Sequence, residues 1–198
     1  MEFYLEYIIY ALITLIIFFV ILNILRKFQW DVIHNNLLDL EDEIGGSILR
    51  KGFLSRPVFT GKYEGSELTI NFSQERIKNK RLNYINVSMN IRIKNSLTII
   101  SLDWLKDKKE STDDLEIVNI DESSKYGIRK SSSKNIFKKD SQKKIKQLIA
   151  QLHPFTYIFV GQTGIIFEKD GENLAITTKK SLLLEIINLL LKMGKTLQ

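Results

Sequence analysis

The sequence predicts an α+β protein, with one N-terminal transmembrane helix and a soluble domain of mainly antiparallel sheet packed with helices on one face. Three observations predict this class. The run from Tyr7 to Leu25 is apolar and contains no charged residue. Residues 57–103 contain apolar and polar side chains in alternation, as half-buried strands do. Two later segments, 140–152 and 181–193, are rich in apolar residues at helical spacing.

The uncharged run has the length of a membrane span. At about 1.5 Å per residue it forms a helix of roughly 28 Å, enough to cross the hydrocarbon core of a bilayer. A cleaved signal peptide would begin with basic residues and end in small ones. Glu2 and Glu6 precede this run instead, and Arg26 and Lys27 follow it. We therefore expect a retained anchor, whose core and interfacial residues include Tyr7, Leu15, Phe18, Leu25, Arg26, Lys27 and Trp30.

The distribution of charge predicts how the anchor is oriented. All lysines and arginines of the chain follow the apolar run. Basic residues concentrate on the cytoplasmic side of a transmembrane helix. We therefore expect a single-pass membrane protein with its N-terminus outside and its C-terminal domain in the cytoplasm. The expected parts are an anchor at 1–27, a juxtamembrane helix at 28–46 and a cytoplasmic α+β domain at 47–198.

The juxtamembrane helix is predicted from Asp31 to Ile44. Ile33, Leu37, Leu40 and Ile44 form one apolar stripe, and Gly45–Gly46 ends the helix. The helix could continue the anchor, pack on the domain or self-associate through the stripe. The pattern is shorter than a coiled coil requires, which favours packing on the core, and a homo-oligomer remains an option.

Antiparallel strands are predicted between 57 and 103. The clearest alternation is at Ile85–Ile93, where five apolar residues alternate with polar ones. One apolar and one polar face are typical of a sheet covered on a single side. The other expected strands are Val58–Tyr63, Glu67–Ser73 and Leu97–Leu102, with a charged connector at Gln74–Arg81 and a turn at Lys94–Ser96.

The second half of the chain predicts further strands and two helices. Asp140 is a candidate N-cap for a helix that His153–Pro154 ends. The final helix, Ser181–Met193 with Gly194 as its stop, either lies buried on the sheet or binds a partner. The remaining expected elements are a solvated loop at Lys106–Asp114, a strand at Leu115–Ile120, an apolar centre at Tyr126–Ile128, a hairpin of Phe155–Val160 and Ile165–Phe167, and a tight turn at Asp170–Gly171 leading to Leu174–Thr177.

Composition and motifs argue against several kinds of chemistry. The chain has 198 residues, a net charge of +6 and no cysteine, which excludes disulfides, thiolate metal sites and cysteine nucleophiles. His34 and His153 have no second ligand at metal spacing. The Gly161–Gly164 segment lacks the Gly-Lys-Ser/Thr ending of a phosphate loop and is interpreted as a hairpin turn. We expect no cofactor, no metal and no enzymatic activity.

The strongest functional signal is a basic segment from Lys125 to Lys146. It could contact anionic lipid, at about 1 kcal/mol per basic residue, or an acidic partner, or be an ordinary solvated face. Tyr126 and Phe137 are its only aromatic residues, too few to favour nucleic acid. The candidate contacts are Lys125, Arg129, Lys130, Lys134, Lys138, Lys139, Lys143, Lys144 and Lys146.

The order of segments resembles a group of proteins. A stretch like Pro57–Gly65 (PVFTGKYEG) leads a β-meander, and a stretch like Tyr126–Leu152 precedes a hairpin and a closing apolar helix. In this the chain resembles uncharacterised bacterial membrane-anchored α+β domain proteins over most of residues 45–193. The resemblance implies an α+β domain at a membrane and carries no known activity or site residues.

Two functional hypotheses follow from the sequence, and an enzyme with an unrecognised site is a third and the least expected. The first is a non-enzymatic, single-pass accessory, assembly or scaffold protein that binds an integral membrane protein partner. The alternative is a peripheral binder of anionic membrane lipid or nucleic acid through the basic segment, nucleic acid being the less expected ligand. The sequence names no small-molecule substrate.

Overall fold

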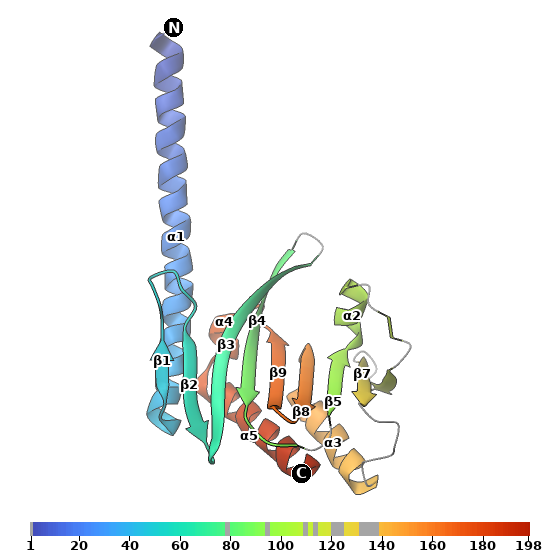
Figure 1. Cartoon of the computed structure of the whole chain (residues 1–198). Coiled ribbons are helices and arrows are strands. Elements are labelled where there is room, and N and C mark those ends of the chain that lie inside the picture. The colour runs from blue at the N-terminus through green and yellow to red at the C-terminus, as the bar shows by residue number, and fades with distance from the viewer. Residues whose placement is uncertain are drawn as a thin grey trace.

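The computed structural model describes residues 2–77, 80–93, 96–108, 111–112, 115–119, 125–130 and 139–198. These residues form a long N-terminal helix and one antiparallel sheet of nine strands, in the order β1-β2-β3-β4-β9-β8-β5-β7-β6 (Figure 1). The strands are β1 Ser47–Leu49, β2 Val58–Tyr63, β3 Ser66–Ile77, β4 Lys80–Met89, β5 Leu97–Ser101, β6 Glu116–Asn119, β7 Lys125–Lys130, β8 Tyr157–Gly161 and β9 Gly164–Asp170. The helices are α1 Glu2–Ile44, α2 Leu102–Lys108, α3 Lys139–Leu152, α4 Leu174–Thr177 and α5 Lys180–Leu197.

The first helix is continuous over 43 residues, and its two halves differ in what surrounds them. Its N-terminal half protrudes from the domain, and α1 is the one helix in the described chain that is long and apolar enough to span a membrane. Its C-terminal half lies against β1 and β2, where Ile33, Leu37 and Leu40 are fully buried. The helix ends at Ile44, and Gly45 after it has a φ of +72°, which glycine readily adopts. The stripe therefore packs into the core, as the sequence predicted.

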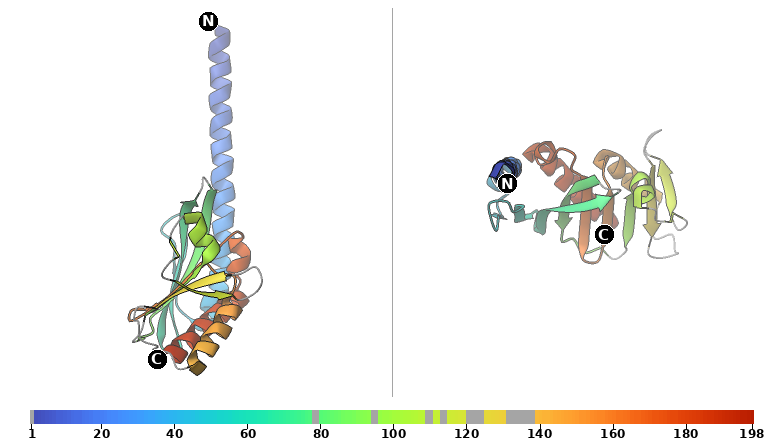
Figure 2. Two further views of the ribbon diagram at one scale, coloured as in Figure 1. Left: turned by 90° about the vertical axis from the view of Figure 1, so that its right-hand side faces the viewer. Right: turned by 90° about the horizontal axis from the view of Figure 1, so that it is seen from above.

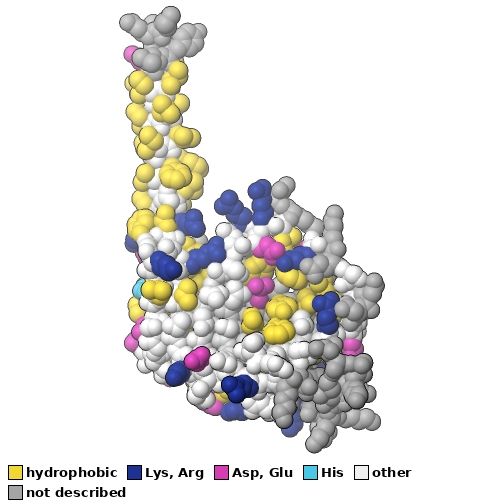
Figure 3. Space-filling model, viewed as in Figure 1, with side chains coloured by type: hydrophobic (Ala, Val, Ile, Leu, Met, Phe, Trp, Pro, Cys, Tyr) yellow, Lys and Arg dark blue, Asp and Glu magenta, His cyan; other side chains and the backbone are white. Residues whose placement is uncertain are grey.

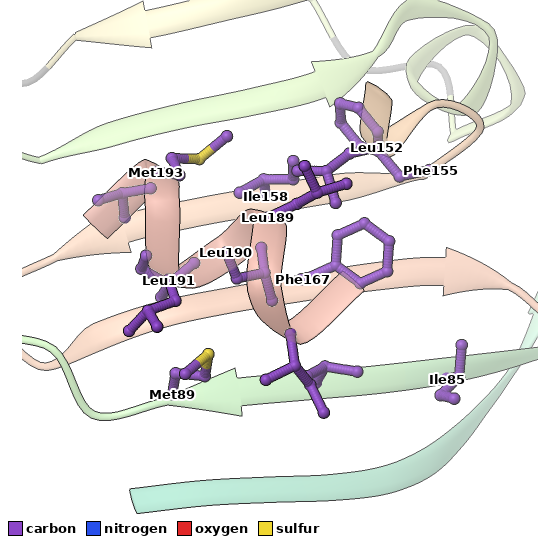
Figure 4. Packing of buried hydrophobic residues seen from close by; sticks show 14 of the residues in the cluster. Ile85, Met89, Leu152, Phe155, Ile158, Phe167, Leu189, Leu190, Leu191 and Met193 are labelled. Carbon is purple, nitrogen blue, oxygen red and sulfur yellow. The ribbon is translucent and has the colours of Figure 1, made fainter. Parts of the chain in front are cut away.

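The main core lies between the sheet and a layer of helices. Helices α3 and α5 lie side by side on one face, and α1 covers the part of that face nearest β1 and β2 (Figure 2). Leucines of α5 pack over Ile158 of β8 and Phe167 of β9, while Leu152 of α3 closes the layer beside Phe155 (Figure 4). The predicted α+β class, with an N-terminal apolar helix and a large antiparallel sheet, is confirmed.

The predicted turn at Lys94–Ser96 implied that Leu97–Leu102 pairs with the strand before it, and the sheet order corrects this. β4 pairs with β3 and β9, whereas β5 pairs with β8 and β7. The C-terminal hairpin β8–β9 is inserted between them, so that Val87 lies opposite Phe167 and Ile99 opposite Ile158. Alternation along a strand does not identify its neighbour, and the predicted turn at Lys94–Asn95 lies outside the described residues.

The charged connector predicted at Gln74–Arg81 is wrong. β3 continues to Ile77 and β4 begins at Lys80, and these two residues pair. The two strands form a ribbon that extends beyond the rest of the sheet (Figure 1). One face of the ribbon is exposed and the other is only half-buried beside α2, so its sequence has few apolar residues and resembles a loop.

Further elements differ in type or length. Strand β4 ends at Met89, although Ile91 and Ile93 beyond it are still buried. Helix α2 includes Lys106–Lys108, which the sequence assigned to a loop. Leu174–Thr177 is a helical turn, because Asn173 accepts a hydrogen bond from the backbone N–H of Ile176 (3.3 Å).

The last helix also passes through its expected stop. α5 continues through Gly194 to Leu197. A Cβ at Gly194 would lie 2.9 Å from Cδ1 of Ile91, so this glycine allows the helix to approach the end of β4. Helix α3 begins at Lys139, one residue before the predicted cap, and the side chain of Asp140 lies outside the described residues.

Replacing Leu40 by Ala tests whether α1 is part of the core. Leu40 is fully buried, whereas Leu38 on the same helix is 40% exposed. Leu40→Ala should lower the free energy of unfolding by about 2–5 kcal/mol because it leaves a cavity. The matched control Leu38→Ala should change it by less than about 0.5 kcal/mol. Urea unfolding in detergent, followed by fluorescence of Trp30 and Trp104, measures both, and equal losses would contradict this packing.

Candidate membrane-facing surface

An ion-pair network joins α1 to the loop that follows β1. Oδ1 of Asp31 accepts from Nη1 of Arg50 at 2.6 Å, and its Oδ2 accepts from Nζ of Lys27 at 2.6 Å. These hydrogen bonds, that of Lys27 first, hold the pKa of Asp31 below its usual value. Asp31 lies six residues beyond Leu25, about 9 Å along the helix. The network therefore holds the loop just beyond the end of the apolar run.

This loop, residues 50–57, combines basic and exposed aromatic side chains. The side chain of Arg50 stabilises the loop by donating hydrogen bonds to the backbone carbonyl groups of Ser55 (3.1 Å) and Phe53 (2.6 Å). Phe53 is 57% exposed, and Phe28 on α1 is 59% exposed. The ammonium group of Lys27 lies 5.9 Å from the ring centroid of Phe53 and 5.8 Å from that of Phe28. Aromatic and basic groups therefore lie together immediately below the anchor.

Arg56 fixes the β3–β4 ribbon beside α1. Its Nη1 donates to the backbone carbonyl of Phe72 at 3.1 Å and its Nη2 to Oε1 of Gln74 at 3.1 Å. The guanidinium group also lies 5.8 Å from the ring centroid of Trp30, whose ring is 5.7 Å from that of Phe72. Burial, with a smaller contribution from Arg26, lowers the pKa of Arg56.

The ribbon reaches back toward the anchor. Trp30 lies five residues beyond Leu25, about 7.5 Å along the helix. Ile77 lies five residues beyond Phe72, about 16 Å along a strand. Because Trp30 and Phe72 are in contact, the ribbon tip reaches the level at which the apolar run ends. Figure 1 shows the ribbon rising on the side from which α1 protrudes. Three exposed basic side chains lie near its tip: Arg76, Lys80 and Arg81.

A cavity of about 230 Å³ lies at the same end of the sheet, beneath α2. Ile100 and Tyr157, which face away from the main core, pack with Leu105 of α2 in a second cluster. At the cavity wall, Nε1 of Trp104 donates to the hydroxyl of Tyr84 at 3.3 Å. Its lining residues are Ile77, Leu82, Tyr84, Ser101, Asp103, Trp104, Asp107, Pro154, Phe155, Thr156, Lys169 and Asp170.

The acidic groups near this cavity are partly desolvated. Burial raises the pKa of Asp170, and Glu172 raises it further. Burial also raises the pKa of Glu168, although Lys108 opposes the shift. Lys108 pairs with Glu75 at 2.9 Å and lies 3.8 Å from the ring centroid of Trp104. The cavity has the size and polarity to hold a few waters or a small polar molecule.

The basic segment singled out by the sequence lies elsewhere. Lys125 and Arg129 are on β7, next to the edge strand β6, and both are exposed. Lys143, Lys144 and Lys146 are exposed on α3, whose first turns lie at the end of the domain away from the anchor (Figures 1 and 2). The backbones of Lys130 and Lys139 are described without their side chains, and Lys134 and Lys138 lie outside the described residues.

The predicted anchor residues lie on one helix, and all but Trp30 are outside the core. Tyr7, Leu15, Phe18 and Leu25 are exposed along the protruding part of α1, as lipid-facing side chains would be. Trp30, expected at the membrane interface, is instead 3% exposed and packs on Phe72. The exposed aromatic residues at this end of the apolar run are instead Phe28 and Phe53, which the sequence pattern did not single out.

The two histidines lie apart, and one has a clear structural role. Nδ1 of His153 shares a hydrogen bond of 2.7 Å with the hydroxyl of Tyr126. His34 is on α1, and its Nδ1 is buried without a hydrogen-bond partner in the protein. Across the described residues, no group of three or more histidine or acidic side chains could hold a metal ion. The Gly161–Gly164 segment is the β8–β9 turn, as predicted.

Comparisons with known proteins bear on the fold. The chain matches no protein-family model and no curated protein. Among solved structures it is similar to the crystal structure of the mycobacterial trehalose monomycolate transport factor A, TtfA, with a TM-score of 0.50 and 8% sequence identity. The match covers 84% of this chain and 94% of that chain. At this identity the likeness shows a shared fold alone.

Replacing Asp31 by Asn tests the link between α1 and the loop. The neutral amide cannot form ion pairs with Arg50 and Lys27, so trypsin should cut after Arg50 or Lys51 several-fold faster. Asp39→Asn, at an exposed site on the same helix, is the control and should not alter the cleavage rate. Because the pKa of Asp31 is lowered in the folded protein, the link should persist above the ordinary carboxyl pKa and weaken only as the pH falls through the lowered value. Unchanged cleavage in Asp31→Asn would show that the loop is held by other contacts.

Proposed function

We propose that this protein is a single-pass, membrane-anchored, non-enzymatic accessory or assembly protein that holds its α+β domain against an integral membrane protein partner. One observation carries the proposal. The anchor and the core-packing part of α1 are a single helix, in which Leu25 and Ile33 are separated by about two turns. Such a connection holds the domain at a fixed distance and rotation relative to the bilayer, which suits contact with a neighbour in the same membrane.

The fold comparison gives the proposal a second support. TtfA, which shares this fold, is a trehalose monomycolate transport factor. By that likeness we infer an accessory role beside a membrane transport or assembly system, with no cofactor of its own. The polar groups around the α2 cavity contact one another, Trp104 with Tyr84 and Lys108 with Glu75, an arrangement that suits a structural role better than a catalytic one.

The proposed topology places the N-terminus outside and the domain in the cytoplasm. Arg26 and Lys27 directly follow the apolar run, and Arg50 and Lys51 lie close to the same end of it. This charge distribution supports the orientation through the positive-inside rule.

A protease-protection measurement tests the topology. A tag after Gln198 should resist protease added to intact cells and become cleavable when the membrane is opened. A second tag before Met1 should show the opposite pattern and serves as the control. A C-terminal tag that is digested in intact cells would reverse the proposed orientation.

Co-purification from native membranes tests the accessory role. In mild detergent with a high-salt wash, one integral membrane protein should be recovered in stoichiometric amount with the full chain. A flexible Gly-Ser insertion after Leu25 should reduce its recovery several-fold, because it uncouples the anchor from the domain. The variant should unfold at the same urea concentration as the wild type, which separates lost binding from lost folding. Recovery of no partner would contradict the proposal.

A groove between α3 and α5 favours a second candidate function. Lys144 of α3 and Lys192 and Lys195 of α5 line it, together with Gln147 and Gln151, and its volume is about 560 Å³. Such a surface could bind an acidic segment of a protein, or nucleic acid, through charge. In the same co-purification, a ligand that is released by the salt wash and retained at low salt would favour this function.

A further inference from the structure

Three segments that are distant in sequence lie along the edge of the domain from which the anchor protrudes. They are the 50–57 loop, the β3–β4 ribbon and α2 (Figure 1). Arg50 holds the loop to Asp31, and Arg56 holds the ribbon to the first turns of α1 after the span. When α1 spans a bilayer, this edge lies at the depth of the lipid headgroups.

The edge is rich in basic side chains. Dark-blue side chains border it in the space-filling view (Figure 3). The 50–57 loop contains Arg50, Lys51 and Arg56 and no acidic residue. Lys51, Lys80 and Arg81 are exposed, and within the described residues they form no ion pair. These three side chains are therefore available to a ligand outside the protein, whereas Arg50 and Arg56 are used within the fold.

Exposed aromatic residues accompany this charge. Phe28 and Phe53 both project at the base of the anchor, and the ammonium group of Lys27 lies within 6 Å of each ring centroid. Basic residues attract anionic headgroups, and apolar side chains gain free energy at the boundary between headgroups and acyl chains. Free phosphate would satisfy the charges and leave the phenylalanines in water, so the combination points to a lipid surface.

We propose that this edge binds anionic phospholipid headgroups, with Lys51, Lys80 and Arg81 contacting phosphate and with Phe28 and Phe53 seated in the headgroup layer. The domain then has a second contact with the membrane in addition to its anchor. Each basic residue near an anionic surface changes occupancy by about fivefold. The proposal does not depend on a protein partner, so lipid contact and partner binding succeed or fail separately.

The absence of cysteine from the chain makes the test site-specific. Gly52→Cys places a single thiol at the exposed tip of the loop and leaves Phe53 and Lys51 intact. Gln162→Cys in the β8–β9 turn is the control. Strand register places this turn beside Met89, the last residue of β4, whereas Lys80 at the membrane-facing edge is the first residue of that strand. Each full-length protein is labelled with an environment-sensitive dye and reconstituted in vesicles of phosphatidylcholine, with and without phosphatidylglycerol.

In vesicles with phosphatidylglycerol, the dye at position 52 should shift its emission to the blue and be quenched by nitroxide-labelled lipid. The dye at position 162 should report water in both vesicles. Reversal of the three proposed contacts, in Lys51→Glu/Lys80→Glu/Arg81→Glu, should return the dye at position 52 to water. Reversal of three basic residues on α3, in Lys143→Glu/Lys144→Glu/Lys146→Glu, should leave its emission unchanged.

Three results would overturn the proposal. They are equal spectra at positions 52 and 162, a spectrum at 52 that does not depend on phosphatidylglycerol, and an equal effect of the two triple reversals. Urea unfolding in detergent confirms that each variant is folded. If the charge-reversal variant does not fold, the milder variant Lys51→Gln/Lys80→Gln/Arg81→Gln replaces it. This variant should weaken the quenching of the dye at position 52. Quenching as strong as in the wild type would contradict the proposal.

Discussion

The burial of one face of α1 in the sheet core is the constraint on which the rest of this structure depends. Ile33, Leu37 and Leu40 are fully buried, and the helix that contains them is the one that continues into the apolar run. Releasing this face would expose three large aliphatic side chains, each stabilised by roughly 1.5–3 kcal/mol through burial. The membrane anchor is thus connected to the folding of the domain itself rather than attached by a linker.

The polar interactions at the base of the anchor follow from that packing. With α1 fixed, Asp31 can reach Arg50, and Trp30 can meet Phe72 and Arg56, so that a short loop and a distant strand are held beside the same helical turn. Two groups of basic side chains lie at opposite ends of the domain. One group lies around the ribbon and the 50–57 loop, at the end from which the apolar run protrudes, and the other lies on α3 and α5 at the far end.

Local patterns predicted the fold class and most elements, because the stripe on α1 and the alternation at Ile85–Met89 each reflect burial on one face. Patterns could not predict strand order, since Ile99 has the same alternating neighbours whether it pairs with β4 or, as it does, with β8. The sequence also directed attention to Lys125–Lys146, where nine basic residues lie within 22 positions. It missed Lys51, Lys80 and Arg81, because the fold alone brings these separate positions to one edge.

Because α1 is continuous, the number of residues between the apolar run and the buried stripe also sets how these two parts are rotated relative to each other. A helix turns by about 100° and rises about 1.5 Å for each residue. One residue added or removed between Leu25 and Trp30 would therefore leave the composition of both halves intact, yet rotate the lipid-facing side chains of the span by more than a quarter turn relative to the sheet. The number of residues between the span and the buried stripe therefore determines the rotation of the domain about the axis of α1, relative to the lipid-facing side of the span.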